Sequence, residues 1–305
     1  MNRLSGEGHL PRPDRRLTSD GPDSGPVPDL RIGDRVLALS RRTHILGILN
    51  VTPDSFYDGG RYPDVPSAVR RAVQMAEQGA DGIDIGGEST RPGSRPVPEE
   101  EEKSRILPVI RAVAAAVDLP ISVDTRRAGV AEAALRNGAH WINDVGGLAD
   151  DPAMIEVAAA HDAAVIVMHK RGSPESMQKN TDYADLIGEI TRFFSETLER
   201  AVRAGLSADR LIFDPGIGFG KSAEDCFRLI RRMEAFTALG RPVCVGPSRK
   251  SFIGAALGIA EAGRLHGTAS AVALASFLGA RLVRVHDVAE MAQVVRIADR
   301  IRLSE

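Results

Sequence analysis

Residues 121–144 read ISVDTRRAGVAEAALRNGAHWIND, and this stretch decides the fold. Its two ends, 121–124 and 141–144, are short β-rich runs. Between them, apolar residues recur at helical spacing over 130–136, and the segment stops at Asn-Gly (137–138), a pair typical of a helix C-terminus. A strand, a helix and a second strand in this order predict two parallel strands joined by a helical crossover.

The same alternation continues in both directions along the chain. Outer helices are predicted at 67–78 and 186–204, the second ending at Gly205. An open doubly wound sheet also alternates in this way, but it usually has about five or six strands and often a glycine fingerprint after the first, which this chain lacks. Eight strands instead favour a closed (β/α)8 TIM barrel of the α/β class. The predicted strands are residues 45–50, 82–85, 121–124, 141–144, 165–169, 211–214, 243–246 and 282–285.

The chain is predicted to hold a single domain at 29–305 behind a tail at 1–28. The tail is rich in Gly, Pro, Ser, Asp and Arg and nearly free of large apolar residues. Burial cannot offset the entropy that it would lose on ordering, so we expect it to be disordered. Apolar runs at 30–32 and 36–39 flank a Gly-Asp turn dipeptide and predict a short hairpin that plugs the lower end of the barrel.

Composition excludes several classes of function. The 305 residues are 43% apolar and carry a formal net charge of -2, with acidic and basic residues interspersed, so nothing indicates a polybasic surface for nucleic acid. No apolar run is long enough to span a membrane, and the start of the chain lacks a signal-peptide core. Cys226 and Cys244 have the spacing of neither a disulfide framework nor a zinc site. We expect a cytoplasmic protein that acts on small molecules, without a nucleic-acid or membrane partner.

Nearly every predicted strand has polar residues at its carboxyl end. Because the carboxyl ends of barrel strands meet at one face, residues far apart in the sequence are expected to share one pocket. Helix capping or a turn would explain any single Asp or Asn, but not all eight strand ends together. The residues are Asn50, Asp84, Asp124, Asn143, His169, Asp214, Ser248 with Arg249 and Lys250, and Arg284 with His286.

These side chains offer two kinds of chemistry. The carboxylates of Asp124 and Asp214 and the amide of Asn143 give a planar hydrogen-bonding pattern that suits a polar heterocycle. Cationic groups suit a phosphate or carboxylate, and they belong to Arg91, Arg249, Lys250 and Arg284, together with His286. Glycine-rich loops at 58–60 and 86–93 follow the first two strands and could close over a substrate.

Two long motifs stand at 50–56 (NVTPDSF, continued by DGG at 58–60) and at 86–93 (GGESTRPG). Shorter motifs follow at 122–125 (SVDT), 142–145 (INDV), 168–169 (MH), 214–221 (DPGIGFGK), 248–251 (SRKS) and 284–287 (RVHD). In this order they resemble the dihydropteroate synthases, and the resemblance covers roughly residues 44–302. It implies a pterin-binding (β/α)8 barrel and a transferase of folate biosynthesis.

The resemblance also implies the substrates and the residues that bind them. The enzyme would condense 6-hydroxymethyl-7,8-dihydropterin pyrophosphate with para-aminobenzoate to give 7,8-dihydropteroate and pyrophosphate. The pterin would be bound by Asp124, Asn143, Asp214 and Lys250, with walls from Met168, Phe219 and the backbone near Gly246. The pyrophosphate would be held by Asn50, Thr90, Arg91, Arg284 and His286, with Mg2+ bridging its oxygens and Asn50. The para-aminobenzoate site would be formed by Phe56, Pro92 and Ser251.

The implied mechanism needs no protein nucleophile. Pyrophosphate leaves first, the electron-rich pterin stabilises the resulting cation, and the aniline nitrogen then attacks. Catalysis would depend on charge stabilisation and on the placement of two reactants by Asp124, Asp214, Lys250, Arg284 and His286. The resemblance further implies a homodimer formed through the last helices and a target of sulfonamides. The segment 267–279 is rich in small residues, which suits either that interface or packing within the chain.

Two positions depart from the pattern of the family. Tyr57 stands in the first loop where Ser is frequent, and its bulk bears on the para-aminobenzoate site and on the response to sulfonamides. Lys170 follows the Met-His pair where Met or Asn is more usual. Arg249, next to Lys250, is interpreted as a structural neighbour rather than as a ligand.

Two alternative functions remain open at this point. A catalytically silent pterin-binding paralogue should have lost Asn50, Thr90 or Arg91, all of which this chain keeps. A folate-dependent corrinoid methyltransferase would share the pterin-binding carboxylates and amide. It should not need the segments at 248–251 and 284–286, and both are present.

Overall fold

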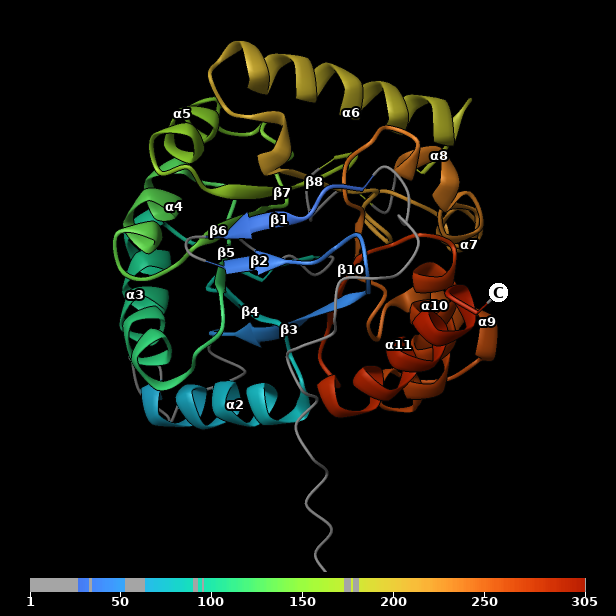
Figure 1. Cartoon of the computed structure of the whole chain (residues 1–305), viewed down its shortest axis with the longest axis horizontal. Coiled ribbons are helices and arrows are strands. Elements are labelled where there is room, and N and C mark those ends of the chain that lie inside the picture. The colour runs from blue at the N-terminus through green and yellow to red at the C-terminus, as the bar shows by residue number, and fades with distance from the viewer. Residues whose placement is uncertain are drawn as a thin grey trace, which may run out of the picture.

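The structure, a computed structural model of the chain, describes residues 27–32, 35–52, 64–89, 93–94, 96–172, 177 and 181–304. Within these ranges, eight parallel strands form a ring in which β3 to β8 pair in sequence order and β10 lies between β3 and β9. The ring closes through a parallel bridge between Phe213 and Val243, and the Phe213 N–H donates to the Pro242 carbonyl oxygen at 2.9 Å. Helices surround these strands (Figure 1), so the predicted (β/α)8 barrel is confirmed.

The strands lie close to their predicted positions. Four of them, at 121–124, 141–144, 211–214 and 282–285, have the predicted bounds. The run predicted at 243–246 ends earlier, because Pro247 has no N–H to extend the ladder. In chain order the strands of the ring are β3 (His44–Asn50), β4 (Gly82–Gly86), β5 (Ile121–Asp124), β6 (Trp141–Asp144), β7 (Ala164–Met168), β8 (Leu211–Asp214), β9 (Cys244–Val245) and β10 (Leu282–Val285).

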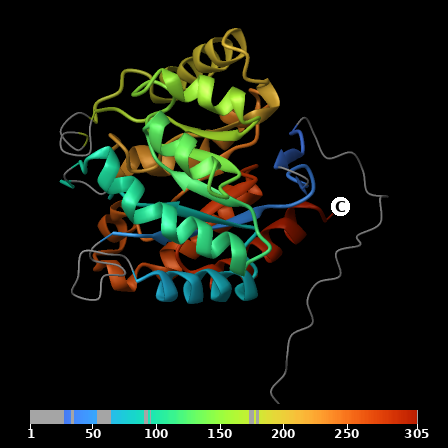
Figure 2. The same ribbon diagram turned by 90° about the vertical axis from the view of Figure 1, so that its left-hand side faces the viewer.

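The helices return the chain along the outside of the ring, and α2 and α3 run side by side there (Figure 2). Local signals fix their ends: the Asp185 carboxylate caps α6, and Gly138 (φ 106°) and Gly205 (φ 93°) take the left-handed conformation just after α4 and α6. The helices are α2 (Val65–Gln78), α3 (Glu99–Ala116), α4 (Ala128–Leu135), α5 (Ala153–Ala160), α6 (Leu186–Arg203), α7 (Ala223–Arg231), α8 (Met233–Thr237), α9 (Ser251–Leu257), α10 (Leu265–Phe277) and α11 (Val288–Arg302), with short 3-10 turns η2 (Ala208–Arg210) and η3 (Glu261–Gly263).

A hairpin closes the amino-terminal end of the ring, as predicted. Its strands β1 (Leu30–Ile32) and β2 (Arg35–Leu37) pair antiparallel, while the predicted turn at 33–34 lies outside the described residues. In Figure 1 both strands lie across the ring. The apolar side chains of the hairpin form one buried cluster with residues inside the ring, namely Leu30, Ile32, Leu37 and Leu39 with Leu46, Trp141 and Leu282.

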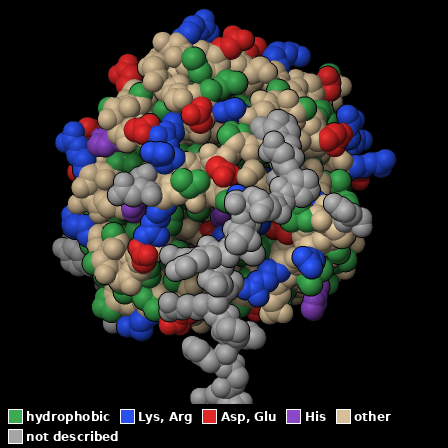
Figure 3. All heavy atoms as spheres, viewed as in Figure 1, with side chains coloured by type: hydrophobic (Ala, Val, Ile, Leu, Met, Phe, Trp, Pro, Cys, Tyr) green, Lys and Arg blue, Asp and Glu red, His purple; other side chains and the backbone are tan. Residues whose placement is uncertain are grey.

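The described fold begins at Val27, which is buried in the same cluster although the sequence places it in the tail. Residues 1–26 of the predicted tail lie outside the described residues. On the face of the molecule drawn in Figure 3, Lys and Arg side chains are interspersed with Asp and Glu. Among the described residues, no helix combines the length and the apolar character needed to cross a membrane.

The interior of the ring changes from apolar to polar along its length. Alternate residues of a strand face the same side, and on β6, β8 and β10 an inward apolar residue is followed two positions later by an inward polar one. Trp141, Ile212 and Leu282 are buried with the hairpin at the amino-terminal end. Their inward successors near the carboxyl end are Asn143, Asp214 and Arg284. The plug therefore supports a polar pocket at the opposite end of the barrel.

Replacing Leu30 with Ala tests the plug. Leu30 is 1% exposed, so the cavity left by its side chain is expected to lower the free energy of unfolding by about 2 to 4 kcal/mol. Val36 in the same hairpin is 58% exposed, and Val36→Ala should change it by less than about 0.5 kcal/mol. Urea denaturation of the two variants measures both values, and equal stabilities would contradict a plug that packs against the core.

Candidate active site

Four side chains converge on one network at the carboxyl end of the ring. The Arg284 guanidinium donates through Nε to Asp84 Oδ2 at 2.5 Å and through Nη2 to Asp124 Oδ2 at 2.6 Å. Asn143 Nδ2 donates to the same Asp84 oxygen at 3.0 Å. These residues come from β10, β4, β5 and β6, so one cation joins strands that lie about two hundred residues apart in sequence.

The register of the strands explains this convergence. Asp124 is paired with Asn143 on one side and with Gly86 on the other. A Cβ atom at Gly86 would lie 3.2 Å from Asp124 Cβ, so glycine gives the Asp124 side chain room beside β4. Arg284 pairs with Leu46 of β3, one strand away from Asp84, and its long side chain reaches across β3.

The network is electrostatically demanding because its two carboxylates are buried and its guanidinium is only 20% exposed. Burial raises the pKa of Asp124 to about 7, although Arg284 opposes this rise. Nearby Asp84 and Glu102 raise it further. Burial alone would lower the pKa of Arg284, but Asp84 and Asp124 hold it above its ordinary value. Arg284 therefore stays cationic, and Asp124 is the member of the network that titrates near neutrality.

A second group of charged residues lies at the same end of the ring, at the end of β8 and in the segment before α9. Burial raises the pKa of Asp214, whereas Lys250 lowers it, and the Gly216 N–H donates to Asp214 Oδ1 at 2.7 Å. Burial lowers the pKa of Lys250 to about 8, and Asp214 opposes this shift. Lys250 Nζ donates to the Ile217 carbonyl oxygen and lies 4.4 Å from the centre of the Phe219 ring. A carboxylate, an ammonium group and an aromatic wall thus lie together.

The end of β10 orients the predicted anion-binding residues. Ser248 Oγ lies 3.0 Å from His286 Nδ1 and accepts the His286 backbone N–H at 3.2 Å. A Cβ at Gly246 would lie 3.8 Å from Arg284 Cβ and 4.0 Å from Lys250 Nζ, so Gly246 separates the two cations. Arg249 instead forms an ion pair with Asp287, with Nε 2.9 Å from Oδ2. This outward contact agrees with its interpretation as a structural neighbour.

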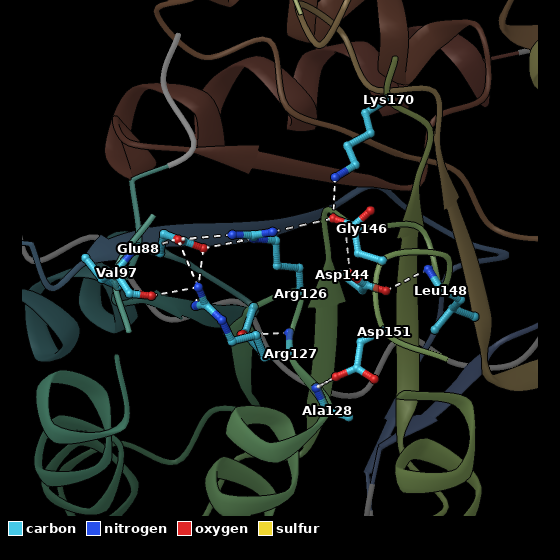
Figure 4. Close-up of polar contacts among 12 residues, drawn as sticks. Glu88, Val97, Arg126, Arg127, Ala128, Asp144, Gly146, Leu148, Asp151 and Lys170 are labelled. Atoms are coloured by element: carbon cyan, nitrogen blue, oxygen red, sulfur yellow. Dashed lines mark hydrogen bonds and ion pairs between the residues drawn. The ribbon is translucent and has the colours of Figure 1, made fainter. Parts of the chain in front are cut away.

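Ion pairs on the rim hold the loops after β4 to β7 (Figure 4). Glu88 accepts the Val97 N–H at 3.1 Å and Arg126 Nε at 3.1 Å, and Arg127 donates to the Val97 carbonyl oxygen at 2.7 Å. The backbone of Val97 is therefore held from both sides, which fixes the two ends of the 88–97 segment. Lys170, one of the departures from the family pattern, forms an ion pair with Asp150 at 2.5 Å.

The remaining predicted residues fall into two groups. Asn50 is partly exposed at the end of β3, Met168 is buried at the end of β7, and Ser251 is exposed at the start of α9 directly after Lys250. The structure thus places all three at the carboxyl end of the barrel. The others lie outside the described residues, and these are Phe56, Tyr57, Thr90, Arg91 and Pro92.

Two residues near the pocket had no assigned role in the sequence analysis. Asp84 was recognised as a polar strand end, but its position as the shared acceptor of Arg284 and Asn143 depends on the barrel. Lys221 ends the motif at 214–221, and it is buried beside His169. Its signal in the sequence is a lysine directly before a Ser-capped helix, which does not predict burial.

Known proteins of one family match this chain over most of its length. A match to the family described as pterin binding enzyme covers residues 46–286. A dihydropteroate synthase from Synechocystis is 46% identical over 273 residues, which are 89% of this chain and 94% of that protein. The Yersinia pestis dihydropteroate synthase with a sulfonamide drug complex has a TM-score of 0.85 at 40% identity and covers 90% of this chain and 100% of its own. The Xanthomonas albilineans enzyme in complex with 7,8-dihydropteroate has a TM-score of 0.82 at 39% identity, covering 91% of this chain and 100% of its own.

Replacing Asp84 with Asn tests the network. The change leaves Arg284 with one charged partner instead of two, so the free energy of unfolding is expected to fall by about 3 kcal/mol. The control is Asp118→Asn, which removes an exposed partner of Arg35 and should cost less than about 1 kcal/mol. Urea denaturation compares the two variants. An unchanged free energy of unfolding for Asp84→Asn would show that Asp124 alone is enough to balance the charge of Arg284.

Proposed function

The chain belongs to the pterin binding enzyme family and is a dihydropteroate synthase, a transferase of folate biosynthesis, and we propose that Asp124, Asn143, Asp214 and Lys250 form its pterin site. It condenses 6-hydroxymethyl-7,8-dihydropterin pyrophosphate with para-aminobenzoate and releases pyrophosphate. The observation that carries the site proposal is that Arg284 donates to Asp84 and Asp124 while Asn143 donates to the same Asp84 oxygen, so side chains of four strands meet at the carboxyl end of the ring. Carboxylates and an amide around an aromatic wall suit the hydrogen-bonding edge of a pterin.

The anion end of the substrate is assigned to the strand ends beside the pterin site. Arg284 and His286 lie at the end of β10, and Asn50 lies at the end of the neighbouring β3. Ser248 orients the His286 ring through Nδ1, so this side chain is placed before substrate binds. Thr90 and Arg91 are assigned to the same role on the resemblance alone, because they lie outside the described residues.

Magnesium fits this arrangement as an ion that arrives with the pyrophosphate. The described residues contain no group of three or more His, Cys, Asp or Glu that could hold a metal. The Asn50 amide supplies one hard oxygen, and Mg2+ commonly keeps few protein ligands while binding substrate phosphates. When bound, Mg2+ would neutralise charge on the departing pyrophosphate.

The para-aminobenzoate site is assigned to Ser251 together with Phe56 and Pro92, of which only Ser251 is described. Ser251 is exposed and follows Lys250 directly, so a ligand there would lie next to the pterin. The relative from Yersinia pestis has been solved with a sulfonamide drug complex. We propose that sulfonamides compete with para-aminobenzoate at this position in the present chain.

The residues of the pocket favour departure of pyrophosphate before attack by the amine. Asp124 and Asp214, when ionised, stabilise positive charge that develops on the pterin. Lys250 restricts the position of the bound pterin, because its ammonium group lies over the Phe219 ring and donates to the Ile217 carbonyl oxygen. Arg284 and His286 stabilise the departing anion. The rate then depends on fixed placement of two reactants and on preorganised charge.

Pyrophosphate release by the purified protein tests this function. The protein is given 6-hydroxymethyl-7,8-dihydropterin pyrophosphate and Mg2+, with and without para-aminobenzoate. Release that depends on para-aminobenzoate, with dihydropteroate as the product, is the expected result. Pterin binding without turnover would identify a silent paralogue, and methyl transfer from a methylated folate to a corrinoid would identify the methyltransferase alternative.

The pH dependence of the reaction follows from the two titrating groups. Asp124, with a pKa of about 7, must lose its proton to accept a hydrogen bond, so kcat/KM for the pterin substrate should rise as the pH passes about 7. Lys250, with a pKa of about 8, must keep its proton, so the same quantity should fall above about 8. Steady-state rates between pH 5.5 and 9.5 measure the profile, and a flat profile would contradict these roles.

An apolar groove between α10 and α11 supports the proposal of a homodimer. Large side chains line it and are exposed in the single chain, namely Leu274 and Phe277 on α10 and Ile297 and Ile301 on α11. The small side chains of Ala269 and Ala273 also line the groove and leave room for a partner to pack closely. A second copy of this chain, presenting the same two helices, is the proposed occupant.

The buried free thiols of Cys226 and Cys244 support a reducing cytoplasm as the location of the protein.

Replacing Ile297 with Glu tests the dimer. Ile297 is 64% exposed in the single chain, so a carboxylate there costs the isolated fold little but would be desolvated in the interface. We expect sedimentation to give a dimer for the original chain and a monomer for Ile297→Glu. Val202→Glu, at a residue of α6 that is 49% exposed, is the control and should remain dimeric. A dimeric Ile297→Glu would place the interface elsewhere.

A further inference from the structure

Lys221 is a buried ammonium group held only by neutral acceptors. It is 2% exposed and lies directly before Ser222, the N-cap of α7. Its Nζ donates to the carbonyl oxygens of Phe219 at 3.0 Å and His169 at 3.2 Å, and it lies 3.0 Å from His169 Nδ1. These three contacts use its three protons. In the described part of the chain, Lys221 forms no ion pair with a carboxylate.

Burying such a group lowers the stability of the fold, so we expect Lys221 to have a role other than stabilising the protein. A cation without a paired anion loses hydration on burial, and neutral acceptors replace it only in part. Burial accordingly lowers the pKa of Lys221 to about 7; Cys226 and Asp214 oppose this shift, while Lys250 and Arg171 add to it. An apolar side chain of similar length would avoid the cost, so the charge itself needs an explanation.

His169 is the fixed partner of Lys221. Burial lowers its pKa to about 3, so the imidazole is neutral and Nδ1 acts as an acceptor towards the ammonium group. Its ring packs edge-on against Phe193, with centroids 5.1 Å apart. The position of Lys221 is therefore set by the end of β7 and by the aromatic residues behind it.

The turn that carries Asp214 packs directly against this pair. The Gly216 N–H donates to Asp214 Oδ1 at 2.7 Å. A Cβ atom at Gly216 would lie 1.9 Å from the His169 carbonyl oxygen and 3.3 Å from Lys221 Nζ. Lys221 Nζ thus lies close to the turn that carries the Asp214 carboxylate, and its charge favours the ionised form of that carboxylate. The charged groups that act on Asp214 are Lys250, Lys221 and Arg284.

Lys221 also fixes the backbone of Phe219. Because the ammonium group bridges the Phe219 and His169 carbonyl oxygens, the segment after β8 is tied to the end of β7. The Phe219 ring lies 4.4 Å from Lys250 Nζ on the pocket side of that segment. One buried side chain therefore supports both the carboxylate and the aromatic wall of the pterin site.

We propose that Lys221 is a positioning residue for pterin recognition, whose ammonium group keeps Asp214 ionised from behind the pocket and holds Phe219 as its wall. The inference rests on the pterin site proposed above. Lys221 contacts the protein alone, so it acts through Asp214 and Phe219. Its loss should weaken pterin binding and leave KM for para-aminobenzoate unchanged.

The test compares Lys221→Gln with the original chain in pterin binding. Glutamine keeps two N–H donors for the same carbonyl oxygens but removes the charge, so it separates the electrostatic role from a purely structural one. The control is Lys103→Gln, which removes a partly exposed charge on α3 that pairs with Glu99 and Glu100. Binding of the pterin substrate, measured by fluorescence titration at pH 6 and pH 8, gives the affinity of each protein.

The charge of Lys221 predicts a particular dependence on pH. At pH 6, below the pKa of about 7 of Lys221, its ammonium group favours the ionised form of Asp214, and Lys221→Gln lacks this charge; the dissociation constant of the variant should be raised about tenfold. At pH 8, above the pKa of about 7 of Lys221, most of this charge is lost in the original chain as well, so the difference should shrink to within about twofold. Asp124 titrates alike in both and cancels in the ratio. Lys103→Gln should match the original chain at both values.

Each outcome decides the proposal. A folded Lys221→Gln with unchanged affinity at pH 6, or with the same loss at both pH values, would overturn the electrostatic role. Lys221→Met provides the same comparison if the glutamine variant does not fold, as judged by thermal denaturation. If the original chain binds no pterin, the proposed pterin site itself is wrong. If both proteins bind pterin with the same affinity, the pterin site stands and only the role of Lys221 is wrong.

Discussion

The pocket depends on the contact of Arg284 with Asp84 and Asp124. Two buried carboxylates and a guanidinium that is 20% exposed are largely removed from water at the carboxyl end of the ring, where unpaired charges would cost several kcal/mol each. The guanidinium joins β10 to β4 and β5, and Asn143 of β6 shares the Asp84 oxygen. Strand ends, carboxylates and the cation are therefore placed together, and a ligand that enters finds its hydrogen-bonding groups already oriented.

This polar end is stable because the opposite end of the ring is apolar. The hairpin of β1 and β2 fills the amino-terminal end, and its leucines pack against Leu46, Trp141 and Leu282 inside the ring. Two of the strands that bury these side chains, β6 and β10, present Asn143 and Arg284 two positions after Trp141 and Leu282. Packing at one end thus fixes geometry at the other, which is the usual division between stability and function in a (β/α)8 barrel.

Support from outside the ring differs around the pocket. On the β4 to β7 side, partly buried ion pairs of Glu88 with Arg126 and Arg127 hold both ends of the 88–97 segment. Beside β8, support comes from Lys221, a single buried cation bound to neutral groups. The first arrangement fixes backbone at the rim. The second places a positive charge next to Asp214, and this charge favours the ionised form of the Asp214 carboxylate when the substrate binds.

The sequence by itself determined the strand and helix order, the barrel and the family, because hydrophobic periodicity and ordered motifs are local properties of the chain. It also identified Asp124, Asn143, Asp214 and Arg284, since strand ends are readable from the pattern. Only the tertiary structure decided which of these touch. Asp84 became the shared acceptor through strand register, and Lys221 became buried because the turn after β8 folds against the end of β7. Burial and register arise from contacts between distant segments, and no local pattern encodes them.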